Sequence, residues 1–214
     1  MNQTASAGKT GKTRKTRGSA GQENPTREGI LEAAAQLIVS EGFNACTMRS
    51  ISQRVNIKAG SLYYHFASKD EIVVEIMNKG TQTLLEQVRS AVENLPDSTP
   101  MVDRLRRAVH VHISCKVDRD LPLMQVYEHL TPVIKRQGRI VRKKYSDFWK
   151  DLFAQGKAAN EIRADLDLDL FTPYILSGLN RAPEWANLEH MKIEDVVDMV
   201  VETIMNGIAP KPAT

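Results

Sequence analysis

Residues 47–66 read TMRSISQRVNIKAGSLYYHF and predict two short helices joined by a tight turn. Thr47 can cap the first helix, because its side-chain hydroxyl can accept a hydrogen bond from a free amide of the first turn. Ile51 and Val55 lie four residues apart, so they share one face of that helix. Asn56 follows, and asparagine tolerates the left-handed conformation in which many helices end.

The second helix is expected over residues 58–66, with Leu62 and Phe66 on its inner face. A short polar helix held against another by a few apolar residues is the helix-turn-helix arrangement, whose second helix enters the major groove of DNA. On the pattern alone, an ordinary helical hairpin in an all-α protein fits as well. The residues available on the outer face are Lys58, Ser61, Tyr64 and His65.

The segment GSLYYHFASKD at residues 60–70 closely resembles the signature of the TetR family of one-component transcriptional regulators. The upstream TMRSI at residues 47–51 is similar to the Thr-x-Arg-x-Ile element of that family. The resemblance covers about residues 26–75. It implies a DNA-binding head, a fourth helix that links the head to the body, and a divergent helical body that binds an effector and forms a homodimer.

Charge is distributed unevenly along the 214 residues. Residues 1–70 carry ten Lys or Arg against five Asp or Glu, whereas the remainder carries 19 against 21. The basic amino-terminal third indicates that this end of the protein binds the phosphate groups of a nucleic acid, and that the rest of the chain has a different function. No apolar run approaches the roughly 18 residues of a membrane span, and the polar amino terminus does not read as a secretory signal. Two cysteines, Cys46 and Cys115, favour a reduced cytoplasmic protein, with one possible disulfide left open.

The chain divides into three predicted parts. Residues 1–24 are rich in Gly, Ser, Thr and Lys, and they are expected to be a disordered basic arm that either contacts DNA or remains a solvated tail. Residues 25–70 form the predicted helix-turn-helix DNA-binding domain, whose first helix ends at Gly42. Residues 71–214 form the predicted ligand-binding and dimerisation domain.

A long helix is expected to start at the capping box Ser68-Lys69-Asp70-Glu71 and to reach about Glu93. No strand-like alternation of useful length appears. The predicted fold class is therefore all-α, with an amino-terminal three-helix head and a carboxy-terminal helical body. The further helices are expected at about residues 100–117, 121–136, 138–159, 168–181 and 193–207.

The candidate DNA contacts fall into two groups. Arginine can pair with guanine through two hydrogen bonds, and alanine can pack on a thymine methyl group. The candidates for reading base edges are Arg49, Lys58, Ala59 and Ser61. The candidates for positioning the DNA backbone are Thr47, Tyr63, Tyr64, His65 and Lys69.

Bulky and polar residues recur at helical spacing in the body. Residues spaced in this way lie on one face of a helix, and they usually belong to the hydrophobic core. A ligand pocket between helices also combines apolar walls with a few polar groups, so the same pattern fits a pocket. The basic residues clustered at 135–144 either form a solvent-exposed face or attract an anionic ligand such as a coenzyme A thioester. The segment from Asp167 to Trp185 faintly resembles the acyl-CoA-responsive branch of the family. The candidate ligand-binding residues are His110, Met124, Tyr127, Phe148, Trp149, Tyr174, Asn180 and Arg181.

The predicted last two helices carry more apolar residues than one neighbour needs, which favours a homodimer formed as a four-helix bundle. His110 and His112 are two residues apart and point in different directions on a helix, so no shared metal site is expected. The alternating carboxylates Asp165, Asp167 and Asp169 are expected to cap the next helix rather than bind calcium. No catalytic motif appears, and no cofactor is expected.

The function predicted from these features is a cytoplasmic transcriptional repressor that binds double-stranded DNA. It would release a pseudo-palindromic operator on binding a small, largely apolar effector, either an acyl-CoA thioester or a plain hydrophobic molecule. Two alternatives remain: a helical binding protein whose helix-turn-helix has no regulatory role, and an activator of the same fold. An enzyme on a helical scaffold is disfavoured, because paired acid–base and metal motifs are missing from the sequence.

Overall fold

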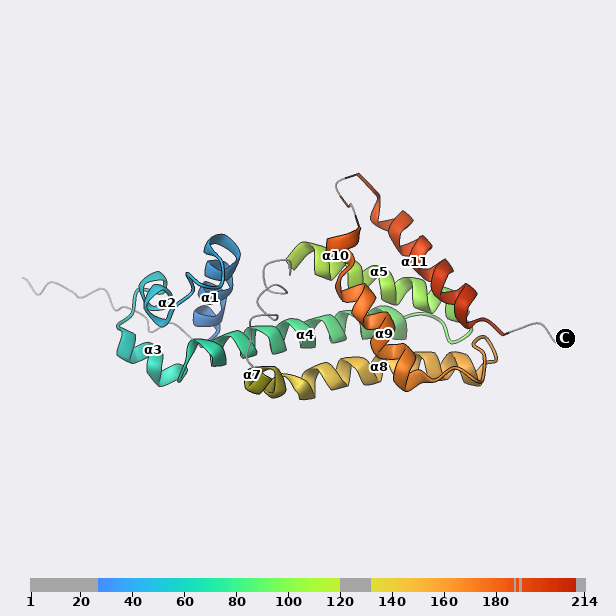
Figure 1. The fold of residues 1–214 in the computed structure, drawn as a ribbon, viewed down its shortest axis with the longest axis horizontal. Helices are drawn as coiled ribbons and strands as arrows, with labels where there is room; N and C mark the ends of the chain where they lie inside the picture. The colour runs from blue at the N-terminus through green and yellow to red at the C-terminus, as the bar shows by residue number, and fades with distance from the viewer. Residues whose placement is uncertain (1–26, 120–131, 187, 189, 211–214) are drawn as a thin grey trace, which may run out of the picture.

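The computed structural model describes residues 27–119, 132–186, 188 and 190–210. Within these ranges the chain forms helices and no strand, which confirms the predicted all-α class (Figure 1). The basic arm at residues 1–24 and most of the helix expected at 121–136 lie outside the described residues.

Three helices make up the head, namely α1 (Arg27–Glu41), α2 (Met48–Arg54) and α3 (Ala59–His65). The long α4 (Lys69–Glu93) runs from the head into the body (Figure 1). The predicted helices in the described ranges are confirmed to within a few residues, whereas the short α10 was not predicted. The described helices of the body after α4 are α5 (Met101–Arg119), α7 (Pro132–Gln137), α8 (Arg139–Ala158), α9 (Leu168–Asn180), α10 (Ala182–Trp185) and α11 (Ile193–Ile208).

Local signals set the boundaries of the head helices as predicted. Gly42 adopts a φ of +85° immediately after α1, and Asn56 adopts a φ of 56° in the turn between α2 and α3. The Thr47 hydroxyl accepts a hydrogen bond from the Ser50 amide at 3.0 Å. The Ser50 hydroxyl in turn accepts one from the Thr47 amide at 2.8 Å, so two free donors at the start of α2 are satisfied by one reciprocal pair.

Side-chain caps also start α4 and α9. The Ser68 hydroxyl accepts from the Glu71 amide at 3.2 Å, and the Glu71 carboxylate accepts from the Ala67 amide at 2.7 Å. The return bond therefore reaches one residue further back than in a standard capping box. The Asp167 carboxylate accepts from the first amides of α9, at 2.8 Å from Asp169, which confirms the predicted cap.

Two separate hydrophobic cores hold the molecule together. The head core collects apolar faces of α1, α2 and α3 around residues such as Ile30, Ile51 and Leu62. The body core is one cluster that includes Trp149 and Phe153 of α8 together with side chains of α4, α5, α9 and α11. The long α4 contributes buried side chains to both cores, and Ile134 of α7 is also buried in the head core, so both helices connect the head with the body in the described part of the chain (Figure 1).

Candidate functional site

The second helix of the helix-turn-helix, α3, is held by its inner face and leaves its outer face free. Leu62 and Phe66 are buried in the head core, with exposed fractions of 0% and 1%. Tyr63 and Tyr64 point the other way, with exposed fractions of 56% and 88%. The outer face of α3 therefore presents two neighbouring aromatic side chains to the surroundings.

The turn that presents α3 is fixed by backbone bonds. The Ile57 amide donates to the Ser52 carbonyl at 2.9 Å, and the Ser61 amide donates to the Lys58 carbonyl at 2.9 Å. Lys58 occupies the position before α3 without using its side chain as a cap. Its ammonium group is therefore available at the amino-terminal end of α3, the end that contacts base edges in helix-turn-helix proteins.

The structure places the predicted DNA contacts on α2, α3 and the start of α4. Arg49 lies on α2 and is exposed, and His65 is half-buried with its ring edge-on to Tyr64 at 5.4 Å between centroids. The exposed members of the set are Thr47, Arg49, Lys58, Ala59, Ser61, Tyr63 and Tyr64.

Lys69 differs from the rest of this set because it already has partners. Its ammonium group donates to the Phe43 carbonyl at 3.2 Å and lies 3.7 Å from the centroid of the Phe43 ring. Lys69 therefore ties the start of α4 to the loop after α1.

Arg27 is a residue whose importance the sequence did not reveal. Its guanidinium Nε donates to the Glu75 carboxylate at 3.0 Å, and its centre lies 4.0 Å from the Phe66 ring centroid. It also donates to the His65 carbonyl at the end of α3. Arg27 thus joins α1, the end of α3 and the first part of α4, and it fixes the orientation of α3. No local signal could have found it, because Glu75 lies 48 residues away.

The predicted ligand-binding residues fall at several places rather than around one described cavity. Trp149 is fully buried in the body core, and Phe148 is half-buried with Arg89 above its ring at 5.7 Å. His110 is half-buried and faces Glu194 of α11, with its Nε2 atom 3.9 Å from the carboxylate. Asn180 is half-buried at the end of α9. Met124 and Tyr127 lie outside the described residues.

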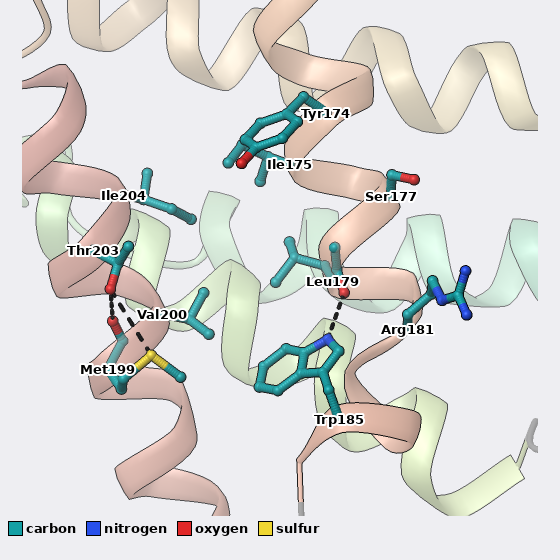
Figure 2. Close-up of a pocket in the computed structure, with 11 residues that line it drawn as sticks. Tyr174, Ile175, Ser177, Leu179, Arg181, Trp185, Met199, Val200, Thr203 and Ile204 are labelled. Carbon is teal, nitrogen blue, oxygen red and sulfur yellow. Dashed lines mark hydrogen bonds between the residues drawn. The ribbon is translucent and has the colours of Figure 1, made fainter.

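Tyr174 and Arg181 line a different feature, an open groove between α9 and α11 with a volume of about 540 Å³ (Figure 2). Its walls are mostly apolar and include the exposed Trp185 and Met199. The Trp185 indole donates to the Gly178 carbonyl at 3.0 Å, which holds α10 against the end of α9. The groove thus lies on the two helices whose surplus of apolar residues predicted a dimer.

The body core also contains a polar cluster. His112 is fully buried, and its Nδ1 atom lies 2.6 Å from the Tyr145 hydroxyl. The Trp149 ring is edge-on to both His112 and Tyr145, at 6.0 Å and 6.3 Å between centroids. Burial, followed by the positive charge of Lys116, lowers the pKa of His112 from 6.5 to about 3. His112 is therefore neutral in the folded protein across the physiological range.

Two further features were sought among the described residues. No group of three or more His, Cys, Asp or Glu in this part of the chain is placed to hold a metal ion. None of its helices is long and apolar enough to cross a membrane.

Two segments of the chain match known protein families. Residues 30–76 match the bacterial regulatory proteins of the tetR family, and residues 98–208 match the tetracyclin repressor-like C-terminal domain. Among known proteins, the HTH-type transcriptional repressor KstR2 of Mycobacterium tuberculosis (strain ATCC 25618 / H37Rv) is 30% identical over 161 residues, covering 73% of this chain and 78% of that protein.

Solved structures show the same fold. The fatty acid degradation regulator FadR from Bacillus halodurans superposes with a TM-score of 0.72 at 19% identity, covering 85% of this chain and 95% of that one. The ketosteroid transcriptional regulator KstR2 of Mycobacterium tuberculosis superposes with a TM-score of 0.64 at 25% identity, covering 90% and 99%.

The buried His112 predicts a pH dependence of stability. The unfolded chain binds a proton on this residue near pH 6.5, whereas the folded chain does so only near pH 3. The free energy of unfolding should therefore fall as the pH is lowered from 6.5, by about 2 kcal/mol at pH 5 from this group alone. Urea unfolding at several pH values measures the slope. His112→Asn should flatten it and exposed His190→Asn should not; equal slopes in all three proteins would contradict this account.

Proposed function

The chain belongs to the TetR family of bacterial regulatory proteins, and we propose that it is a homodimeric repressor whose DNA binding is relieved by a small effector. The observation that best supports this proposal is the difference in burial between the two faces of α3. Leu62 and Phe66 anchor it, while Tyr64 is 88% exposed on the opposite side. Such a repressor acts in the cytoplasm, where its operator lies.

The proposed DNA-binding domain comprises residues 25–70, with α3 in the major groove. Arg49, Lys58, Ala59 and Ser61 read base edges in this proposal. Because one α3 spans only a few base pairs, two copies must bind half-sites about 34–36 Å apart or a multiple of that distance. A pseudo-palindromic operator follows from the twofold symmetry of the dimer.

The first test of this proposal substitutes the outer face of α3. Lys58→Ala and Tyr64→Ala should each weaken binding to the upstream DNA of the gene by about 1–3 kcal/mol, provided that each side chain makes its contact. Fluorescence anisotropy with labelled duplex measures the affinity, and Lys192→Ala, which removes an exposed charge from the body, serves as the matched control. Unchanged affinity in both head variants would remove α3 from the interface.

The proposed dimer interface is the outer face of α9 and α11, within the body at residues 71–214. Tyr174 is 74% exposed and Met199 is 47% exposed along the groove of Figure 2. Val200 lies between them on the wall of the groove and is half-buried. Apolar surface gathered on two adjacent helices is buried most simply against a twofold copy, as a four-helix bundle.

A charge placed in this groove tests the interface. Val200→Glu should yield monomers, because dimerisation would bury an unpaired carboxylate, while the helical content measured by circular dichroism stays close to that of the wild type. Glu202→Lys changes an exposed charge on the same helix outside the groove and should remain dimeric. Sedimentation velocity gives the oligomeric state, and a dimeric Val200→Glu protein would rule out this placement.

The proposed effector is small and largely apolar, with a coenzyme A thioester as the preferred class and a plain hydrophobic molecule next. The names of two similar proteins, a fatty acid degradation regulator and a ketosteroid regulator, support a ligand of this kind.

The effector must bind better to a state in which the two copies of α3 no longer match the spacing of the grooves, because only differential affinity shifts such an equilibrium. Titration of the operator complex with acyl-CoAs, free fatty acids and hydrophobic drugs should release the DNA with the thioesters. Release by the acids or drugs but by no thioester would eliminate the coenzyme A class. Release by none of them would contradict the proposed effector response.

A further inference from the structure

The second helix of the helix-turn-helix, α3, has few contacts of its own that keep it helical. It spans seven residues, and isolated helices shorter than about 12–15 residues are marginal in water. Its second residue, Gly60, is exposed, and a Cβ atom added there would meet no atom within 4 Å, so a poor helix former occupies this position without a packing reason. Only Leu62 is buried, and Lys58 provides no side-chain cap at the amino-terminal end. The helical form of α3 therefore depends on other parts of the head.

The carboxy-terminal end of α3 is capped by a side chain from a different helix. The last carbonyl groups of a helix have no partner within that helix. The carbonyl of His65, the last residue of α3, accepts a hydrogen bond from Nη1 of Arg27 in α1, 38 residues earlier in the chain. A positive charge at this end also stabilises α3, because the carboxy-terminal end of the helix dipole is negative.

The other two nitrogens of the Arg27 guanidinium are held by α4. Nε and Nη2 donate to the two carboxylate oxygens of Glu75, and Nη2 also lies 3.7 Å from the Glu71 carboxylate. The guanidinium lies 4.0 Å from the ring centroid of Phe66, which follows α3. One nitrogen thus binds α3 while two bind α4. Lysine could not reproduce this arrangement, because an ammonium group lacks the planar fork that pairs with a carboxylate.

The capped turn of α3 carries the outward-facing Tyr64. This side chain is 88% exposed, and its ring is edge-on to that of His65, whose carbonyl Arg27 binds. If the last turn opened, Tyr64 would lose its fixed position relative to Lys58 at the other end of α3. Readout of base edges requires such fixed positions, whereas attraction between cations and phosphates does not.

We propose that Arg27 caps α3 from α1 and thereby sets the specificity of operator binding, without contacting the DNA itself. This inference rests on the proposed repressor function and adds a positioning residue to it. Without the Arg27 side chain, the last turn of α3 opens. Sequence-specific binding then weakens, while binding to unrelated DNA persists because it depends on charge.

A direct contact between Arg27 and a DNA phosphate is the competing role, since the Arg27 side chain is 45% exposed. Its partner Glu75 distinguishes the two roles. In Glu75→Gln the guanidinium loses its internal anion, and the head gains one unit of positive charge. A phosphate contact would become stronger in this variant, whereas a cap would become weaker because the guanidinium is no longer held in place.

Hydrogen–deuterium exchange of the full-length protein without DNA tests the cap. Arg27→Gln and Glu75→Gln should each lower the protection of amides in residues 63–66 by about fivefold, the usual effect of losing a helix cap. Lys79→Gln is the matched control, because it removes the Glu28–Lys79 pair, which also joins α1 to α4 but does not touch α3. This control should keep the wild-type protection of residues 63–66.

Fluorescence anisotropy with an operator duplex and an unrelated duplex tests the specificity. Arg27→Gln, Arg27→Lys and Glu75→Gln should each lower the ratio of the two affinities by about fivefold or more. Arg27→Lys keeps the charge, so its affinity for the unrelated duplex should equal that of the wild type. Lys79→Gln should leave the ratio unchanged.

Three results would overturn the role of Arg27 and leave the repressor function standing, provided that the wild type binds its operator. They are unchanged protection of residues 63–66 in Arg27→Gln, an unchanged affinity ratio in Arg27→Lys, and a higher operator affinity in Glu75→Gln. The last of these would assign Arg27 to a phosphate contact. Failure of the wild-type protein to bind any upstream DNA would overturn the repressor function and the specificity role together.

Discussion

A single helix, α4, contributes buried side chains to two hydrophobic cores that lie far apart along its length. Ile72 and Ile76 are locked into the head, and Leu85 and Val88 into the body. Burial of each such side chain is worth roughly 1.5–3 kcal/mol, so neither end of α4 can leave its core without a large loss. Any change in the body must therefore either move the head as well or deform the stretch of α4 between the cores.

The arrangement of the head follows from the same constraint. α3 has only Leu62 on its own inner face and Phe66 just after its end to hold it, so its orientation depends on contacts made by other elements. Arg27 provides them by binding the His65 carbonyl, the Phe66 ring and Glu75 of α4 together. α3 is fixed to α4 in this way, so in the proposed repressor the orientation of α4 sets the orientation in which α3 meets the DNA.

Local chemistry made much of the head predictable from the sequence. The cap at Thr47, the left-handed Asn56 and the end of α1 at Gly42 each depend on one or two neighbouring residues, and all three are found in the structure. Contacts between distant residues were not predictable. The Arg27–Glu75 pair joins positions 48 residues apart, and neither side chain carries a local signal of the other.

The body shows the same limit for the candidate ligand residues. Tyr174 and Trp149 both occupy helical stripes, and nothing in the spacing says which stripe faces inward. The structure buries Trp149 in the core and exposes Tyr174 in the groove between α9 and α11, because the packing partners of α9 determine which of its faces is covered. The face of a helix that is buried depends on the elements that pack against it, and the sequence alone does not specify those elements.

In the proposed repressor, two copies of α3 at a fixed separation bind one operator. Hydroxyl-radical footprinting of the full-length protein on its own upstream DNA should show two protected patches whose centres lie one helical turn of DNA, or a multiple of it, apart. Both patches should weaken together when Tyr64 is replaced by alanine. A single protected patch, or a double footprint that Tyr64→Ala leaves unchanged, would exclude this mode of binding.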